Sequence, residues 1–127
     1  MQLQKNAINW FEIPVADFDR AKKFYSTIYE FDMPEMNMDG VRMGFFLYDQ
    51  QSMGVGGAIV HGDGLGPSAG GPKVYLNGGD DLDNVLNRVQ AAGGKVVLPK
   101  TEITPEFGYY ATFEDTEGNE VSLHSMG

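Results

Sequence analysis

Hydrophobic and polar positions along the chain follow two different periods, one typical of strands and one typical of helices. Residues 7–13 (AINWFEI) predict a strand that ends at Pro14. Asp17 predicts the N-cap of a following helix. The 3.6-residue period places four apolar side chains on one face of that helix: Phe18, Ala21, Tyr25 and Ile28. The first half of the chain is completed by an irregular strand at 31–38, a hairpin turn at Asp39-Gly40, and strands at 41–49 and 54–61.

A glycine-rich segment separates this half from a similar one. Residues 62–71 (GDGLGPSAGG) contain five glycines and one proline, which disfavour both helix and strand. The order of elements then restarts, with a helix that Asp80 or Asp81 caps and Gly93-Gly94 ends. The apolar face of this helix is formed by Leu82, Val85, Leu86 and Val89. The strands around it are predicted at 73–77, at 95–98 with Pro99 as its end, at 109–114 and at 120–125.

The two halves form an internal repeat. A shift of 64 residues aligns Asp17 with Asp81, and Gly54 with Gly118. The repeated order predicts an α+β fold in which one helix packs on one face of each four-stranded sheet, leaving the opposite faces free to enclose a cavity. We expect two tandem βαβββ modules, 6–61 and 72–125, joined by the linker 62–71 in a single domain, 1–127.

Composition and charge narrow the possible functions. The 127 residues include two histidines and no cysteine. The lack of cysteine excludes disulfide frameworks, thiolate catalysis and zinc–cysteine sites. Nine Lys and Arg against eighteen Asp and Glu give a net charge of -9, which argues against nucleic acid and anionic membranes as partners. The start of the chain lacks a signal-peptide pattern, and no apolar run approaches the length of a membrane span. We therefore expect a cytoplasmic protein.

Three stretches carry a family resemblance: FEIPVADFDRAKKFY (11–25), DDLDNVLNRVQAAGGKVVLPKTEI (80–103) and FEDTEGNEVSLHS (113–125). Their order and spacing resemble the vicinal oxygen chelate superfamily of type I glyoxalases, bleomycin-resistance proteins, extradiol dioxygenases and methylmalonyl-CoA epimerases. The resemblance covers nearly the whole chain. It implies cup-shaped mixed sheets built from paired βαβββ modules, a small-molecule ligand and a homodimer.

In the metal-dependent members of this superfamily, four side chains from four strands chelate one divalent ion. The resemblance carries these positions onto Trp10, onto Gly57 or Ala58, onto Lys73 or Val74, and onto Ser122. None of these is a usual ligand of a divalent metal, and a lysine is protonated at neutral pH. We therefore expect the usual metal centre to be missing and no cofactor to be needed.

Two polar side chains are candidates for catalysis. Strand parity places Glu12 on the face of Trp10, and His124 on the face of Ser122. A carboxylate beside an imidazole forms an acid–base pair, which Lys73 would support electrostatically. Glu12, Glu120 and His124 also suggest a displaced metal site, although His61, the remaining histidine, has the parity that points out of the cup.

Aromatic side chains on the predicted strands indicate an apolar binding surface. The expected ligand-binding residues are Trp10, Phe46 (with Phe45 as the alternative), Tyr48, Lys73, Tyr109 and Ser122. The first hypothesis is a protein that binds a small apolar or aromatic molecule in the cup without a metal. The second is a lyase or isomerase of the glyoxalase type, acting by acid–base chemistry or with a displaced divalent metal. A third is a small domain that regulates a partner through its acidic surface.

Overall fold

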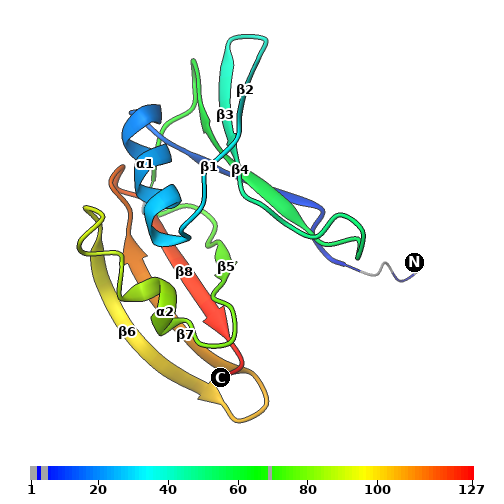
Figure 1. The fold of residues 1–127 in the computed structure, drawn as a ribbon, viewed down its shortest axis with the longest axis vertical. Coiled ribbons are helices and arrows are strands. Elements are labelled where there is room, and N and C mark those ends of the chain that lie inside the picture. The colour runs from blue at the N-terminus through cyan, green and yellow to red at the C-terminus, as the bar shows by residue number, and fades with distance from the viewer. Residues whose placement is uncertain (1–2, 4–5, 69) are drawn as a thin grey trace.

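Two four-stranded sheets and two helices form the described part of the chain (Figure 1). The computed structural model describes residues 3, 6–68 and 70–127, so residues 1–2 and 4–5 and the linker residue Ala69 lie outside the described residues. The first module comprises β1 (Trp10–Pro14), α1 (Phe18–Ile28), β2 (Glu35–Met38), β3 (Val41–Phe45) and β4 (Gly56–His61). The second comprises β5 (Tyr75–Asn77), α2 (Asp83–Leu86), β6 (Lys95–Thr104), β7 (Gly108–Glu114) and β8 (Glu120–Ser125).

The two sheets have matching topologies. The strand orders are β1-β4-β3-β2 and β5-β8-β7-β6, so the first strand of each module lies at an edge beside the last. β1 runs parallel to β4, with Trp10 beside Gly56, and β5 runs parallel to β8, with Tyr75 beside Ser122. The other strand pairs are antiparallel. These matching orders confirm the predicted α+β fold with a duplicated βαβββ pattern.

Of the two strands predicted to end at a proline, β1 does end at Pro14, whereas β6 continues past Pro99. β1 begins at Trp10 and includes Pro14, because Val15 donates its N–H to the Val60 carbonyl at 2.8 Å and position 14 therefore faces the open edge of the sheet. β6 runs ten residues to Thr104 and passes through Pro99. It is also an edge strand, and its register shifts on both sides of Leu98, where an irregular ladder tolerates a residue without an N–H.

The second helix is shorter than its apolar period predicts. α2 covers only Asp83–Leu86, and turns continue the chain as far as Gly93. Its N-cap residue is Leu82, whereas Asp81 accepts a hydrogen bond from the Asp83 backbone N–H at 3.0 Å without capping the helix. Asp17 does cap α1, through a 3.1 Å hydrogen bond from the Arg20 backbone N–H. Within the described residues, neither helix has the length and apolar character needed to cross a membrane.

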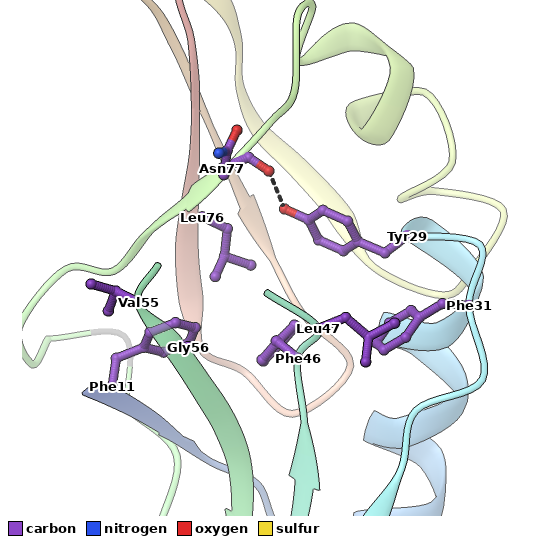
Figure 2. A pocket seen from close by; sticks show the side chains of 9 residues that line it. All are labelled: Phe11, Tyr29, Phe31, Phe46, Leu47, Val55, Gly56, Leu76 and Asn77. Carbon is purple, nitrogen blue, oxygen red and sulfur yellow. Dashed lines mark hydrogen bonds between the residues drawn. The ribbon is translucent and has the colours of Figure 1, made fainter. Parts of the chain in front are cut away.

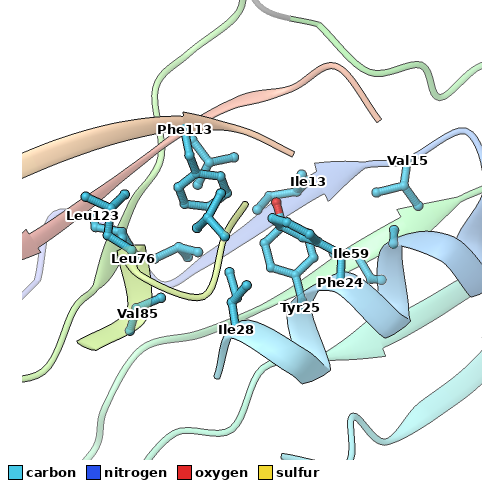
Figure 3. Close-up of a cluster of buried hydrophobic side chains, with 14 of the residues drawn as sticks. Ile13, Val15, Phe24, Tyr25, Ile28, Ile59, Leu76, Val85, Phe113 and Leu123 are labelled. Atoms are coloured by element: carbon cyan, nitrogen blue, oxygen red, sulfur yellow. The ribbon is translucent and has the colours of Figure 1, made fainter. Parts of the chain in front are cut away.

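One hydrophobic core joins the two modules (Figure 3). Ile13 and Ile59 reach it from the first sheet, and Phe113 and Leu123 reach it from the second. α1 contributes the fully buried Tyr25, together with four further side chains: Phe18, Ala21, Phe24 and Ile28. Because both sheets pack their helix-side faces on this one core, their opposite faces point away from each other. We call these the first outer face, on β1–β4, and the second outer face, on β5–β8.

A buried polar turn connects β7 and β8 to the first module. The Asp115 carboxylate accepts hydrogen bonds from the Tyr25 hydroxyl at 2.8 Å and from the backbone N–H groups of Glu117 and Asn119. Burial and the neighbouring Asp115 charge raise the pKa of Tyr25, so its hydroxyl stays protonated and donates. The Asn119 amide also donates to the Pro14 carbonyl at 2.8 Å, which ties the turn to the end of β1.

Glu117 binds the same turn to the start of α1 through hydrogen bonds and an ion pair. One of its carboxylate oxygens accepts the backbone N–H groups of Ala16 and Asp17, at 3.0 and 2.6 Å. Its other oxygen lies 2.7 Å from Arg20 Nε, completing a two-pronged ion pair. The Glu117 side chain is fully buried, whereas Arg20 is half-exposed. Asp115, Glu117 and Asn119 are together called the polar lock below.

Candidate functional site

Three aromatic rings gather on the first outer face. Trp10 lies on β1 and Phe45 ends β3, and their ring centroids are 6.1 Å apart. Tyr48 follows β3 and meets Trp10 nearly edge-on at 6.4 Å. Gly56 allows this packing, because a Cβ at that position would overlap the Tyr48 ring. Beside the rings is a cavity of about 340 Å³ lined by Trp10, Pro34, Phe45, Phe46, Leu47, Tyr48 and Gln50.

The alternation of β1 explains why these groups share a face. Phe11 and Ile13 pack toward the core, so the residues between and before them, Glu12 and Trp10, point outward. Trp10 Nε1 donates to Glu12 Oε2 at 3.3 Å, which aligns the carboxylate with the edge of the indole. The first outer face therefore offers a half-exposed aromatic surface with one exposed carboxylate beside it.

The second outer face is more polar. Ser122 alternates with the core residues of β8, and its buried hydroxyl lies 2.9 Å from the Thr112 hydroxyl. His124 has the same parity, and its Nε2 lies 2.6 Å from the Phe107 carbonyl. A wider cavity of about 700 Å³ borders His124 at the end of this face. Its lining is Tyr75, Leu76, Asn77, Gly79, Asp80, His124, Ser125, Met126 and Gly127.

Two aromatic residues predicted to bind a ligand in the cup lie on the helix side instead. Phe46 packs against Tyr25, with centroids 5.2 Å apart, because its neighbour Phe45 faces outward and successive strand residues point to opposite faces. Tyr109 packs against the core, on the same side of β7 as Phe113. The outward positions are Phe45, the alternative from the sequence, and Tyr110, a strand aromatic that pairs with His124 in the ladder and was passed over in favour of Tyr109. The alternation along β7 could have identified Tyr110.

The comparisons with known proteins agree with this architecture. The profile of the Glyoxalase/Bleomycin resistance protein/Dioxygenase superfamily matches residues 7–123. The chain belongs to this superfamily. A glyoxylase-like domain-containing protein from Didymella fabae is 30% identical over 115 residues, which cover 88% of each chain.

Solved structures with a similar fold extend this comparison. TnmS3, an antibiotic binding protein from Streptomyces sp. CB03234, is 25% identical over 98% of both chains, with a TM-score of 0.67. A glyoxalase I mutant from Zea mays has a TM-score of 0.71 and 16% identity over 93% of this chain and 45% of the maize chain, which shows a shared fold alone. The family resemblance seen in the sequence is therefore confirmed.

The residues at the superfamily's usual metal-ligand positions do not fit a divalent ion. Trp10 offers only an indole N–H donor, and Ala58 offers no side-chain ligand atom. The Ser122 hydroxyl is buried against Thr112, and Lys73 is an exposed cationic side chain just before β5. Within residues 3, 6–68 and 70–127, no group of three or more His, Cys, Asp or Glu side chains is arranged to hold a metal ion. The expectation that this chain works without a metal stays a prediction.

The structure does not bring Glu12 and His124 together within one chain. Glu12 bonds to Trp10 on the first outer face, and His124 bonds to the Phe107 carbonyl on the second. Glu12 lines a different cavity from His124, beside the linker and Asn119. His61, considered for a displaced metal site, has its Nδ1 2.9 Å from the Val15 carbonyl, away from the outer face. A single chain therefore forms neither the acid–base pair nor the displaced metal set.

Proposed function

We propose that this chain is a metal-free binding protein for a flat apolar or aromatic molecule, held against the first outer face. The observation that carries the proposal is the cluster of Trp10, Phe45 and Tyr48, whose rings lie at stacking distances above a floor of Gly56 and Ala58. Aromatic walls of this kind favour planar ligands through stacking and apolar burial. The antibiotic-binding activity stated for TnmS3 supports the same class of function.

A second copy of the chain completes the binding site in this proposal. The two outer faces of one chain point apart, so a cup needs the first outer face of one copy opposite the second outer face of another. Several large apolar side chains stand exposed on these faces, among them Met36 at 49%, Met38 at 52% and Tyr75 at 53%. Large apolar side chains exposed in this way are typical of interaction surfaces. A homodimer would cover it and enclose the ligand.

Fluorescence of Trp10, the one tryptophan of the chain, gives a direct test. Acridine, a planar three-ring compound, is expected to bind saturably and quench this emission. The variant Tyr48→Ala should weaken acridine binding by about tenfold, which corresponds to about 1.4 kcal/mol. Thr27→Ala, on the exposed side of α1, serves as the control and should bind normally. Equal affinities for the wild type and Tyr48→Ala would refute the site.

A glyoxalase-type lyase or isomerase is the second candidate, because both Glu12 and His124 point outward. In the dimer described above, Glu12 of one copy would face the second outer face of the other, where His124 lies. Turnover of hemithioacetals, measured with and without added Ni²⁺ or Zn²⁺, tests this candidate. The enzyme hypothesis predicts turnover that falls in Glu12→Gln. The binding hypothesis predicts no turnover in either protein.

A further inference from the structure

A further cavity lies between the two modules, on the helix side of the first sheet (Figure 2). Its volume is about 220 Å³. The lining comes from both modules and consists of Phe11, Tyr29, Phe31, Phe46, Leu47, Val55, Gly56, Leu76 and Asn77. We call it the intermodule cavity. It shares Phe46 and Leu47 with the cavity beside Trp10, but it is also lined by Phe11 and Leu76, which pack on the core side of the sheets.

The internal repeat contains a matching junction that borders a smaller cavity, of about 160 Å³, with more polar side chains in its lining. The 64-residue shift places Val55 on Asn119, and the β1–β4 and β5–β8 registers place Leu76 on Ile13. At that matching junction the Asn119 amide bonds to the Pro14 carbonyl, and its oxygen accepts the Ser68 backbone N–H at 2.9 Å. The junction at Val55 has an apolar wall where its counterpart has a hydrogen-bonded amide. The two junctions share a backbone framework and each borders a cavity, but the cavity at Val55 is larger and its wall is apolar where the other has the Asn119 amide.

The side chains that line the intermodule cavity favour neutral ligands. Six of the nine lining residues carry hydrocarbon side chains: Phe11, Phe31, Phe46, Leu47, Val55 and Leu76. The main polar group is the Tyr29 hydroxyl, which donates to the Asn77 carbonyl at 2.9 Å and keeps its oxygen lone pairs as acceptors. Burial raises the pKa of Tyr29 well above its usual range, so the phenol is uncharged at neutral pH. A charged ligand would lose its hydration here without gaining an opposite charge.

The volume sets the size of the ligand. An apolar protein cavity of roughly 150 Å³ is enough to hold benzene. The intermodule cavity, at about 220 Å³, has room for one substituted ring or a short branched hydrocarbon. Leu47 stands at its edge with 68% of its surface exposed, which gives a small molecule a route past a single side chain.

We propose that the intermodule cavity is a second binding site, for a neutral single-ring or short-chain apolar molecule carrying at most one hydroxyl. It is separate from the site proposed on the first outer face. A hydroxyl on the ligand would donate to Tyr29, and the hydrocarbon part would contact the side chains of both modules. A ligand there would contact Val55 and Leu76 at once, and would thereby stabilise the packing of one module on the other.

Titration with p-cresol, followed by methyl carbon–proton NMR, tests the proposal. Saturable binding should shift the methyl resonances of Val55, Leu76 and Leu47 first. Val55→Phe fills the cavity and should weaken binding at least about tenfold. Val97→Phe is a matched control at a site 48% exposed on β6, and it should bind p-cresol like the wild type. Benzoate, a ring of similar size with a charge, should not bind.

Further measurements distinguish binding in the intermodule cavity from binding on the first outer face. Tyr48→Ala should leave p-cresol binding unchanged while weakening acridine binding. If Val55→Phe fails to fold, Leu47→Trp gives a second block at the exposed edge of the cavity. The proposal is overturned if p-cresol does not bind saturably, if its shifts centre on Trp10, or if the folded cavity variants bind it normally. None of these outcomes depends on whether acridine binds the first outer face.

Discussion

The turns that precede β4 and β8 occupy matching positions in the two modules, yet they have opposite characters. In the second module the turn at 115–119 is buried, polar and hydrogen-bonded across the module boundary. In the first module the matching residues 51–54 are exposed, and Val55 after them lines the intermodule cavity. One copy of the repeat therefore stabilises the fold, and the other leaves apolar surface available for binding.

The chemistry of a few positions produces this difference. Under the 64-residue shift, Asp115 matches Gln51, Glu117 matches Met53 and Asn119 matches Val55, while Gly118 matches Gly54. Gly118 has a φ of 87° in the second turn, whereas in the first turn the residue with positive φ is Met53, at 57°, just before Gly54. The carboxylates and amide that form the polar lock occur only in the second, where the carboxylates accept hydrogen bonds from Ala16, Asp17 and Tyr25 of the first module. The same backbone arrangement therefore forms a stabilising contact in the second module and a binding surface in the first.

The largest expected effect comes from Asp115→Ala. The change removes the acceptor of the Tyr25 hydroxyl and of two backbone N–H groups, all of them buried. We expect the free energy of unfolding to fall by about 4 kcal/mol, at roughly 1–2 kcal/mol for each donor left unsatisfied. Urea unfolding measures this loss. The matched change Gln51→Ala, at the same position of the repeat, should cost less than about 0.5 kcal/mol, and comparable losses for the two variants would contradict the proposed asymmetry.

A smaller effect is expected at Gly56, which packs under the Tyr48 ring and also lines the intermodule cavity. A Cβ at this position overlaps the Tyr48 ring, so Gly56→Ala should displace that ring from the first outer face. We expect a cost of about 2 kcal/mol, as for other overpacked positions, together with weaker acridine binding. Glu120→Ala, at the matching position of β8, should leave both stability and acridine binding near wild type. Retention of full acridine affinity in Gly56→Ala would remove Tyr48 from the proposed site.

The smallest expected effect is a change in the pH dependence of stability. Burial alone would raise the pKa of Glu117, but hydrogen bonds from Arg20 and from the Asp17 backbone hold it below its ordinary value. The folded carboxylate therefore binds a proton at lower pH than the unfolded one, whose pKa is about 4.3. Its stabilisation is present above that value and is lost as the pH falls through the folded pKa.

Urea unfolding at several pH values checks this sign. Between about pH 5 and pH 3, the wild type should lose stability more steeply than Glu117→Gln, which has no carboxylate at this position. At neutral pH the wild type should be the more stable protein. Parallel pH profiles for the two proteins would show that Glu117 does not contribute through its charge.

Local patterns in the sequence predicted most of the fold. The repeat offset, the cap at Asp17 and the parity of Trp10 and Ser122 all follow from short-range periodicity, and the structure has them. The course of β6 through Pro99 and the shortness of α2 depend instead on which strands lie at sheet edges and on tertiary packing.

The periodicity of the sequence could not predict how the two modules pack on each other. Alternation identifies the residues that share a face, but the direction of each face depends on how α1 packs between the sheets. Glu12 and His124 therefore have the predicted parity and still lie on faces that point apart. The polar lock appeared in the sequence only as a turn, because the partners of Asp115 and Glu117 lie about 90 to 100 residues away along the chain.

The most direct test of the central proposal is an intermolecular nuclear Overhauser measurement on the acridine complex. We predict contacts from acridine protons to the Trp10 indole and to the rings of Phe45 and Tyr48. Contacts confined to Phe11, Val55 and Leu76 in the intermodule cavity, or no contacts under saturating acridine, would contradict the assignment of the first outer face as the ligand-binding surface.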